Sequence, residues 1–232
     1  MASILRLLLI VLLSFSGSSV FSQNTNSFVG IRFGAALPLG EFASHEIGYG
    51  GYALLGKSFG GEAAWFFSPE FGVGIDVSRN SFEFASGYYA EDFYQQNKQD
   101  YIHVSLLSGP YTLTTFMAGG YYKLAWDKRF SSSFKLMGGL FRARTPDQFF
   151  GIKTYKAGNL NWSKSGARDT KFTLLAGVST EYRLYPQVSL VLQADFTFSR
   201  PAFTFITGET SSYTDYLYMP VFRLQPGINI HF

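Results

Sequence analysis

Apolar and polar residues alternate along the last stretch of the chain, residues 216–232. One parity carries large apolar side chains and the other carries polar or small ones: Phe222, Leu224, Ile228, Ile230 and Phe232 against Arg223, Gln225, Gly227, Asn229 and His231. A period of two sustained over this length predicts a strand that faces lipid on one side and a polar interior on the other.

The same alternation recurs upstream and predicts an all-β protein. We expect seven further strands near residues 28–37, 52–67, 71–77, 111–126, 134–143, 172–184 and 189–198. Three connections are short turns, at 68–70, 127–129 and 185–187, and they alternate with long polar loops at 38–50, 82–109, 144–170 and 199–215. Barrels of outer membranes have short periplasmic turns and long external loops. The pattern therefore predicts an eight-stranded antiparallel transmembrane β-barrel, an up-and-down meander with both termini in the periplasm.

Ionisable side chains fall on the inward face of most of these strands. They are four basic and four acidic residues: Arg32, Glu62, Asp76, Lys123, Glu181, Arg183, Asp195 and Arg223. The interior of an eight-stranded barrel is just wide enough for side chains to fill it. We therefore interpret the eight as a lumen charge network that closes the barrel. The alternative is a proton or ion path, because ionisable groups inside membrane proteins often mark one.

The beginning of the chain and its composition fit export to the bacterial outer membrane. Arg6, the apolar run 7–15 and the small residues that follow predict a signal peptide over residues 1–22, which leaves 23–232 as the barrel domain. Aromatic residues make up 19% of the chain and charged residues only 15%, below the usual quarter of a soluble domain. A net charge of +3 is too small to indicate a nucleic-acid partner.

Outward aromatic residues gather near the short turns and the C-terminus. They are Trp65, Phe67, Phe71, Trp126 and Phe232. Aromatic side chains at a membrane–water interface form such girdles, so we expect these residues to contact outer-membrane lipid at the periplasmic side.

Candidate catalytic and cofactor residues are few. The chain has three histidines, and His103 with Ser105 two positions away supplies two members of a hydrolase triad but no third. There is no cysteine, no histidine pattern with metal spacing and no glycine-rich phosphate loop between a strand and a helix. We therefore expect no enzyme activity, no cofactor and no metal.

Two loops carry features that a partner could use. Aromatic residues in 82–109 and 144–170 lack an evident place to bury, and we interpret them as contacts for another envelope protein: Tyr88, Tyr89, Phe93, Tyr94, Phe149, Phe150 and Tyr155. Packing among the loops is the alternative. The segment 142–171 is also rich in lysine and arginine, which we interpret as solvated charge, with contact to anionic lipid or an acidic partner as the alternative.

Two short motifs support a family resemblance. Residues 35–42, Ala-Ala-Leu-Pro-Leu-Gly-Glu-Phe, end the first strand, and Ile230, His231 and Phe232 end the chain. The chain resembles the small outer-membrane β-barrel domain family of Bacteroidota, including the PorT-like proteins, and the eight-stranded OmpA-like and OmpX-like barrels. The resemblance covers residues 23–232. It implies eight antiparallel strands and a terminal Phe232 that resembles the signal read by the barrel-assembly machinery.

Function follows less directly, because one barrel fold hosts many activities. Our first hypothesis is a non-enzymatic barrel whose loops or rim bind other envelope proteins, in an envelope or secretion assembly. A narrow porin-like channel for small solutes is the second. A lipid-modifying enzyme is the third, and it lacks an identifiable catalytic set.

Overall fold

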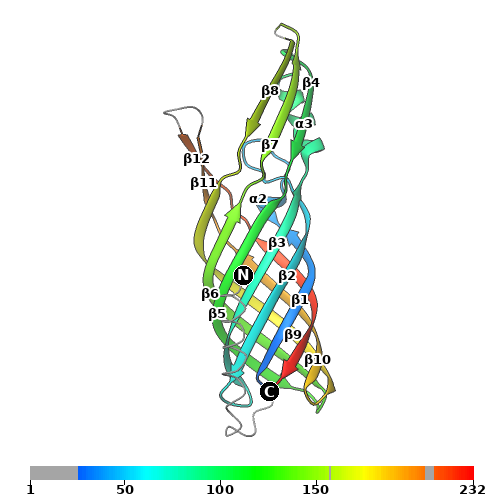
Figure 1. Ribbon diagram of the computed structural model, residues 1–232, viewed down its shortest axis with the longest axis vertical. Coiled ribbons are helices and arrows are strands. Elements are labelled where there is room, and N and C mark those ends of the chain that lie inside the picture. The colour runs from blue at the N-terminus through cyan, green and yellow to red at the C-terminus, as the bar shows by residue number, and fades with distance from the viewer. Residues whose placement is uncertain (1–25, 157, 207–211) are drawn as a thin grey trace, which may run out of the picture.

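The computed structural model describes residues 26–156, 158–206 and 212–232. The predicted signal peptide, residues 1–22, lies outside the described residues. Eight antiparallel strands close into a barrel in the order β1-β13-β10-β9-β6-β5-β3-β2, which confirms the predicted meander (Figure 1). The barrel strands are β1 (Phe28–Pro38), β2 (Ala53–Phe66), β3 (Phe71–Phe84), β5 (Tyr111–Ala125), β6 (Phe130–Arg144), β9 (Arg168–Tyr185), β10 (Val188–Phe198) and β13 (Val221–His231).

The barrel is apolar outside and polar inside, as the alternation predicts. Phe33, Phe59 and Phe172 are 63–70% exposed on the outer wall, whereas Arg32 and Arg223 are at most 2% exposed in the lumen. Successive side chains of a strand point to opposite faces, so the period of two in the sequence becomes an outer and an inner surface. None of the helices in the described residues is long and apolar enough to cross a bilayer.

The long connections lie at one end of the barrel, which we call the mouth, and the short turns lie at the other end. The first residues of β1 pair with the last residues of β13, Phe28 with His231, at the short-turn end. The chain therefore enters and leaves the barrel on that side (Figure 1). The predicted girdle aromatics Trp65, Phe71 and Trp126 lie there too, each at least half exposed on the outer wall.

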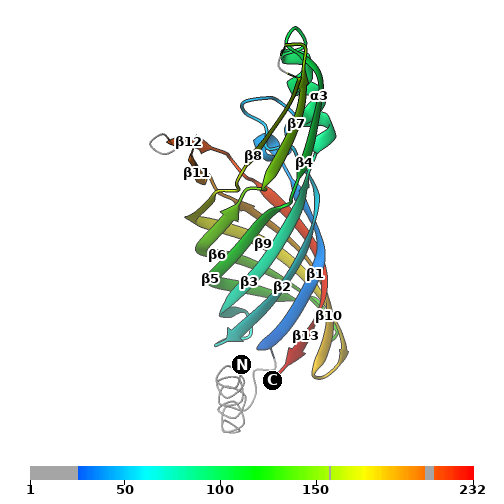
Figure 2. The same cartoon turned by 45° about the horizontal axis from the view of Figure 1, so that its top comes forward.

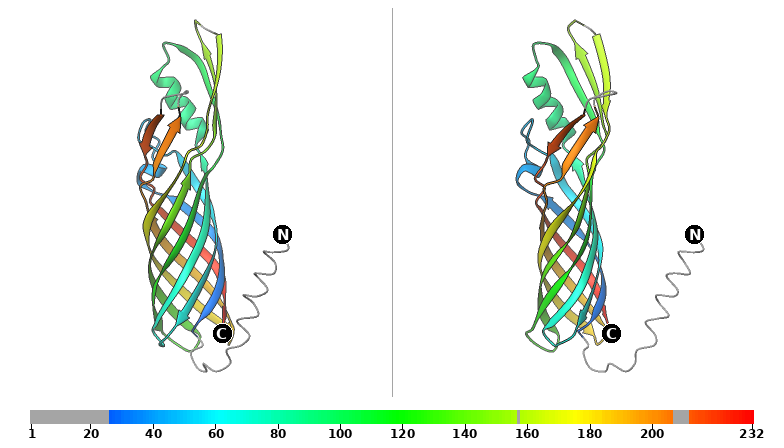
Figure 3. Two further views of the ribbon diagram at one scale, coloured as in Figure 1. Left: turned by 60° about the vertical axis from the view of Figure 1, so that its left-hand side comes forward. Right: turned by 90° about the vertical axis from the view of Figure 1, so that its left-hand side faces the viewer.

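The prediction of loops is wrong for 82–109, 144–170 and the described part of 199–215, where most residues form helices and strands, whereas 38–50 is a loop that holds only one short helix. The long segments contain α2 (Gly40–Ala43), α3 (Ser86–Gln96), β4 (Tyr101–Ser108), β7 (Gln148–Thr154), β8 (Gly158–Lys164), β11 (Ala202–Ile206) and β12 (Ser212–Tyr216). β4, β7 and β8 form a three-stranded sheet that stands beyond the mouth, and β11 and β12 form a separate hairpin (Figures 2 and 3). These strands carry polar residues because they rise above the lipid-facing wall.

Candidate functional site

The mouth of the lumen is sealed by an apolar plug. Phe42 from the short helix α2 is fully buried between the barrel walls, with its ring 5.1 Å from the rings of both Phe82 and Tyr111. Leu113, Phe141, Met219 and Val221 belong to the same buried cluster. A continuous layer of packed hydrocarbon offers an ion no hydrogen-bonding groups, so it opposes ion passage.

Below the plug, Lys135 is the centre of a buried charge layer. Its ammonium Nζ lies 2.8 Å from Glu62 Oε2, 3.2 Å from Asp76 Oδ2 and 3.3 Å from Asp195 Oδ1. All four side chains are at most 4% exposed. The four residues lie on four different strands, β2, β3, β6 and β10. The ion pairs of Lys135 therefore connect β6 with three other strands across the lumen.

Two arginines complete the layer. Arg223 Nη2 lies 2.8 Å from Asp195 Oδ2 and 3.6 Å from Asp76 Oδ1, and its Nη1 donates to the hydroxyl of Ser78. Arg32 lies 4.0 Å from Glu62 and donates to the side chains of Gln193 and Asn229. Three cations therefore face three carboxylates, and amide and hydroxyl groups satisfy most of the remaining hydrogen-bonding capacity.

A second ionic group lies nearer the short turns. Lys123 Nζ is 3.4 Å from Glu181 Oε2, and His231 Nε2 is 2.6 Å from Glu181 Oε1. Phe28, Phe66 and Tyr121 pack beside it in an apolar cluster, with ring centroids 6.1–6.5 Å apart. The described side chains thus fill the lumen in successive layers along its length.

Seven of the eight predicted lumen charges are buried, and the eighth, Arg183, keeps the inward parity opposite the buried Ser189. Arg183 is only half buried, because it lies near the end of β9 beside the turn 186–187. Sequence reasoning missed Lys135, the best-connected cation. The signal was present, since Phe134 and Leu136 are exposed on the outer wall and alternation places Lys135 inward.

The lumen brings together a serine, a histidine and a carboxylate, but not as a triad. Ser189 Oγ and Glu181 Oε1 both contact the same ring nitrogen of His231, Nε2, at 2.9 and 2.6 Å. A hydrolase triad needs the serine and the carboxylate on opposite ring nitrogens. His231 Nδ1 has no hydrogen-bond partner, and Ser189 is fully buried. This arrangement cannot present an activated serine to a substrate.

The other candidate pair and the metal search also give no site. Ser105 Oγ donates to the backbone carbonyl of Gly151 at 3.1 Å, and His103 lies opposite Lys153 in the ladder. Over residues 26–156, 158–206 and 212–232, no cluster of three or more His, Cys, Asp or Glu side chains is placed to hold a metal ion.

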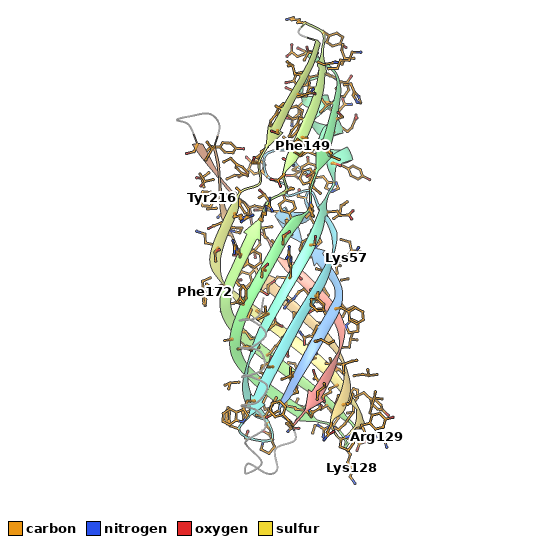
Figure 4. All side chains as sticks on the ribbon, viewed as in Figure 1. Lys57, Lys128, Arg129, Phe149, Phe172 and Tyr216 are labelled. Atoms are coloured by element: carbon orange, nitrogen blue, oxygen red, sulfur yellow. The ribbon has the colours of Figure 1, made fainter. Side chains whose placement is uncertain are left out.

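Beyond the mouth, α3 packs on the β4-β7-β8 sheet and forms what we call the distal lobe. Its core consists of Ala90, Val104, Phe150 and Ile152 with Tyr89, Phe93 and Tyr94 against them. Four of the seven predicted contact aromatics therefore pack within the lobe, and the prediction of exposure is wrong for Phe150, which is 3% exposed. Tyr88, Phe149 and Tyr155 are 57–64% exposed (Figure 4 labels Phe149).

Tyr52 fastens the distal lobe to the first long connection. Its hydroxyl is within donating distance of two acceptors, Asp92 Oδ2 on α3 at 2.9 Å and the backbone carbonyl of His45 at 2.8 Å. The His45 ring stacks between Tyr52 and Tyr88, 5.2 and 4.9 Å away. Burial and the hydrogen bond to Asp92 raise the pKa of Tyr52 well above its ordinary value. The contact with Asp92 joins α3 of the distal lobe to the connection between β1 and β2.

The apolar face of the lobe sheet continues beyond the area that α3 covers. Leu160 and Trp162 on β8 lie opposite the buried Ile152 and Phe150 on β7, yet they are 46% and 45% exposed. The Trp162 ring stacks on Phe150 at 4.0 Å. Within the described part of the chain, β8 pairs only with β7, so one edge of this strand is unpaired.

Lys164, the last residue of β8, contacts the β11-β12 hairpin. Lys164 Nζ lies 3.8 Å from the centroid of the Phe205 ring and 5.6 Å from that of Tyr213. These cation–π contacts hold the hairpin beside the last residue of β8. A pocket of about 140 Å³ lies between them, with Tyr49, Tyr89 and Tyr216 in its wall. The middle of β8, with Leu160 and Trp162, stands above this contact.

The chain is similar to solved structures of outer-membrane barrels. No protein-family model and no curated protein matches the chain. Neisserial surface protein A is 11% identical with a TM-score of 0.49, over 89% of this chain and 97% of that one. Ail of Yersinia pestis is 12% identical with a TM-score of 0.45, over 89% and 97%. A major outer membrane protein of Thermus thermophilus is 13% identical with a TM-score of 0.46, over 89% and 100%.

The closed strand order, the apolar outer wall and the filled lumen define an eight-stranded membrane-spanning β-barrel.

Proposed function

We propose that the protein is a non-enzymatic binding protein of the bacterial outer membrane, with the barrel as its anchor and the distal lobe as its binding module. The lobe supports this role because it has its own packed core and still leaves Leu160 and Trp162 half exposed beside an unpaired edge of β8. The filled lumen, with its plug at Phe42, disfavours the alternative of a narrow channel.

We infer that the partner is another envelope protein, which adds an extended segment to the free edge of β8. Edge strands present unpaired N–H and C=O groups, and peptide recognition by strand addition uses them together with side-chain pockets. We choose Trp162 as the anchor, since tryptophan is enriched among the few interface residues that carry most of the binding energy. A role in a secretion or envelope assembly would follow from the partner's identity.

We infer the orientation of the barrel in the membrane from the lengths of its connections. Short turns lie in the periplasm in barrels of this type, which would place the distal lobe outside the cell. Contact with the barrel-assembly machinery through Phe232, and a place among the PorT-like barrels of Bacteroidota, rest on the resemblance of residues 35–42 and 230–232 alone.

A pull-down with variants of β8 tests the proposed binding surface. The tagged protein would be extracted from outer membranes in mild detergent, and any companion quantified. We expect a stoichiometric envelope protein with the wild type and at least about tenfold less with the double variant Leu160→Ala/Trp162→Ala, because loss of two anchors that the partner would bury costs well over 1 kcal/mol.

Leu107→Ala is the matched control, because Leu107 is 73% exposed on the opposite face of the same sheet. It should retain the companion. A barrel that is purified alone, or a double variant that keeps its companion at the wild-type level, contradicts the proposed function.

A further inference from the structure

Basic residues gather on the outer wall of the barrel just below the distal lobe. Across β3, β5, β6 and β9, one row of neighbouring outward positions holds Arg79, Thr114, Arg142 and Thr170. The next row toward the lobe extends over β2 and holds Lys57, Ser81, Thr112, Arg144 and Arg168. Figure 4 labels Lys57 on this upper part of the wall. Neighbouring strands are about 5 Å apart, so five cations lie within a small area.

An apolar row lies directly on the membrane side of these cations. It holds Val77, Phe116, Leu140 and Phe172, which are 41–70% exposed and are neighbours across the same four strands. Two residues along a strand separate this row from Arg79 and Arg142, a rise of about 7 Å. The cations therefore border the lipid-facing band and do not project into open solvent on a flexible loop.

The arginines surround a pocket with little negative charge of its own. Arg79, Arg142, Arg144 and Arg168 line a hollow of about 230 Å³ together with Thr112 and Thr114. Arg144 forms an ion pair with Asp147 at 2.8 Å, and among the described residues the other three arginines form none. Like charges on neighbouring strands repel each other, so a bound anion would stabilise this cluster.

We propose that this pocket binds the phosphate of an anionic lipid in the membrane leaflet at the mouth of the barrel. Guanidinium groups match phosphate oxygens with pairs of hydrogen bonds, and the two threonine hydroxyls add donors in the same wall. The acyl chains of the lipid then lie along Phe116 and its apolar neighbours. An acidic protein fits less well, because it would have to cover an apolar row that sits at the depth of the lipid chains.

Lipid retention after extraction tests this site. The purified protein would be reconstituted in phosphatidylcholine vesicles containing phosphatidic acid, extracted in mild neutral detergent, and analysed for lipid that co-purifies. We expect the wild type to retain phosphatidic acid over phosphatidylcholine. Arg142→Gln/Arg168→Gln should retain roughly 10- to 30-fold less, because each cation near a membrane surface contributes about 1 kcal/mol.

Lys128→Gln/Arg129→Gln is the matched control, since these exposed cations lie in a short turn at the other end of the barrel (Figure 4). It should behave like the wild type. Equal retention by all three proteins, or no preference for phosphatidic acid, overturns the proposal. A parallel titration with inorganic phosphate separates the sources. If phosphate alone raises the melting temperature of the wild type and phosphatidic acid is not retained, the site binds the free ion and the lipid assignment is wrong.

Discussion

Replacing Lys135 with methionine is expected to lower the free energy of unfolding of the barrel by about 3–5 kcal/mol, the usual cost of removing one partner from a buried ionic group. Methionine keeps the length of the side chain but leaves Glu62, Asp76 and Asp195 without the cation that they share. Arg223 and Arg32 are the cations that remain, and Arg32 is 4.0 Å from Glu62. Two positive charges then face three carboxylates in a closed lumen.

Urea-dependent unfolding from detergent micelles would measure the effect of Lys135→Met. Lys128→Met is the control, because Lys128 is exposed in a short turn and its loss should change stability by less than about 0.5 kcal/mol. The double variant Lys135→Met/Asp195→Asn should be less destabilised than the sum of its single variants, since the two groups are in contact. A single variant Lys135→Met as stable as the wild type would show that this network does not hold the strands together.

Gly177→Ala is the second large effect that we expect, a loss of about 3 kcal/mol. Gly177 lies on β9 facing the lumen, and a Cβ there would overlap Asp195 Oδ1 and come within 2.8 Å of Lys135 Cε. Both neighbours belong to the ion pair at 3.3 Å, so a methyl group forces them apart. The absence of a side chain at this position is what lets the charges meet.

Gly61→Ala is the matched control for Gly177→Ala. A Cβ at Gly61 meets only the carbonyl oxygen of Gly30 at 3.7 Å, an ordinary contact distance. The unfolding midpoints of the two alanine variants in the same urea series check the prediction. Similar midpoints would mean that the charge layer tolerates displacement and that its packing is looser than the distances indicate.

The barrel could be predicted from the sequence because the alternation of apolar and polar residues follows directly from lipid on one side and a filled lumen on the other. The predicted strand ends were less accurate where the outer wall becomes polar. β3 continues past Val77 to Phe84, and β6 and β9 extend to Arg144 and back to Arg168. Arg79 and Arg142 keep the alternation with charged residues in place of apolar ones, so the apolar pattern ends before the strands do.

The distal lobe could not be predicted, because its burial is created by contacts between segments far apart in the chain. Phe150 is buried by α3 and by Trp162, which no local pattern in residues 144–170 indicates. The lumen network was largely accessible to sequence reasoning, since parity alone assigns its members. Lys135 was not among the predicted residues, although its parity also places it in the lumen.

Single-channel recording of the wild-type protein in planar bilayers tests the sealed lumen most directly. Phe42 fills the mouth, and Lys135 forms ion pairs with carboxylates on three other strands. We therefore predict no steady conductance above that of the bare bilayer. A reproducible ohmic current after insertion would contradict a closed barrel, and it would make the narrow channel the leading function.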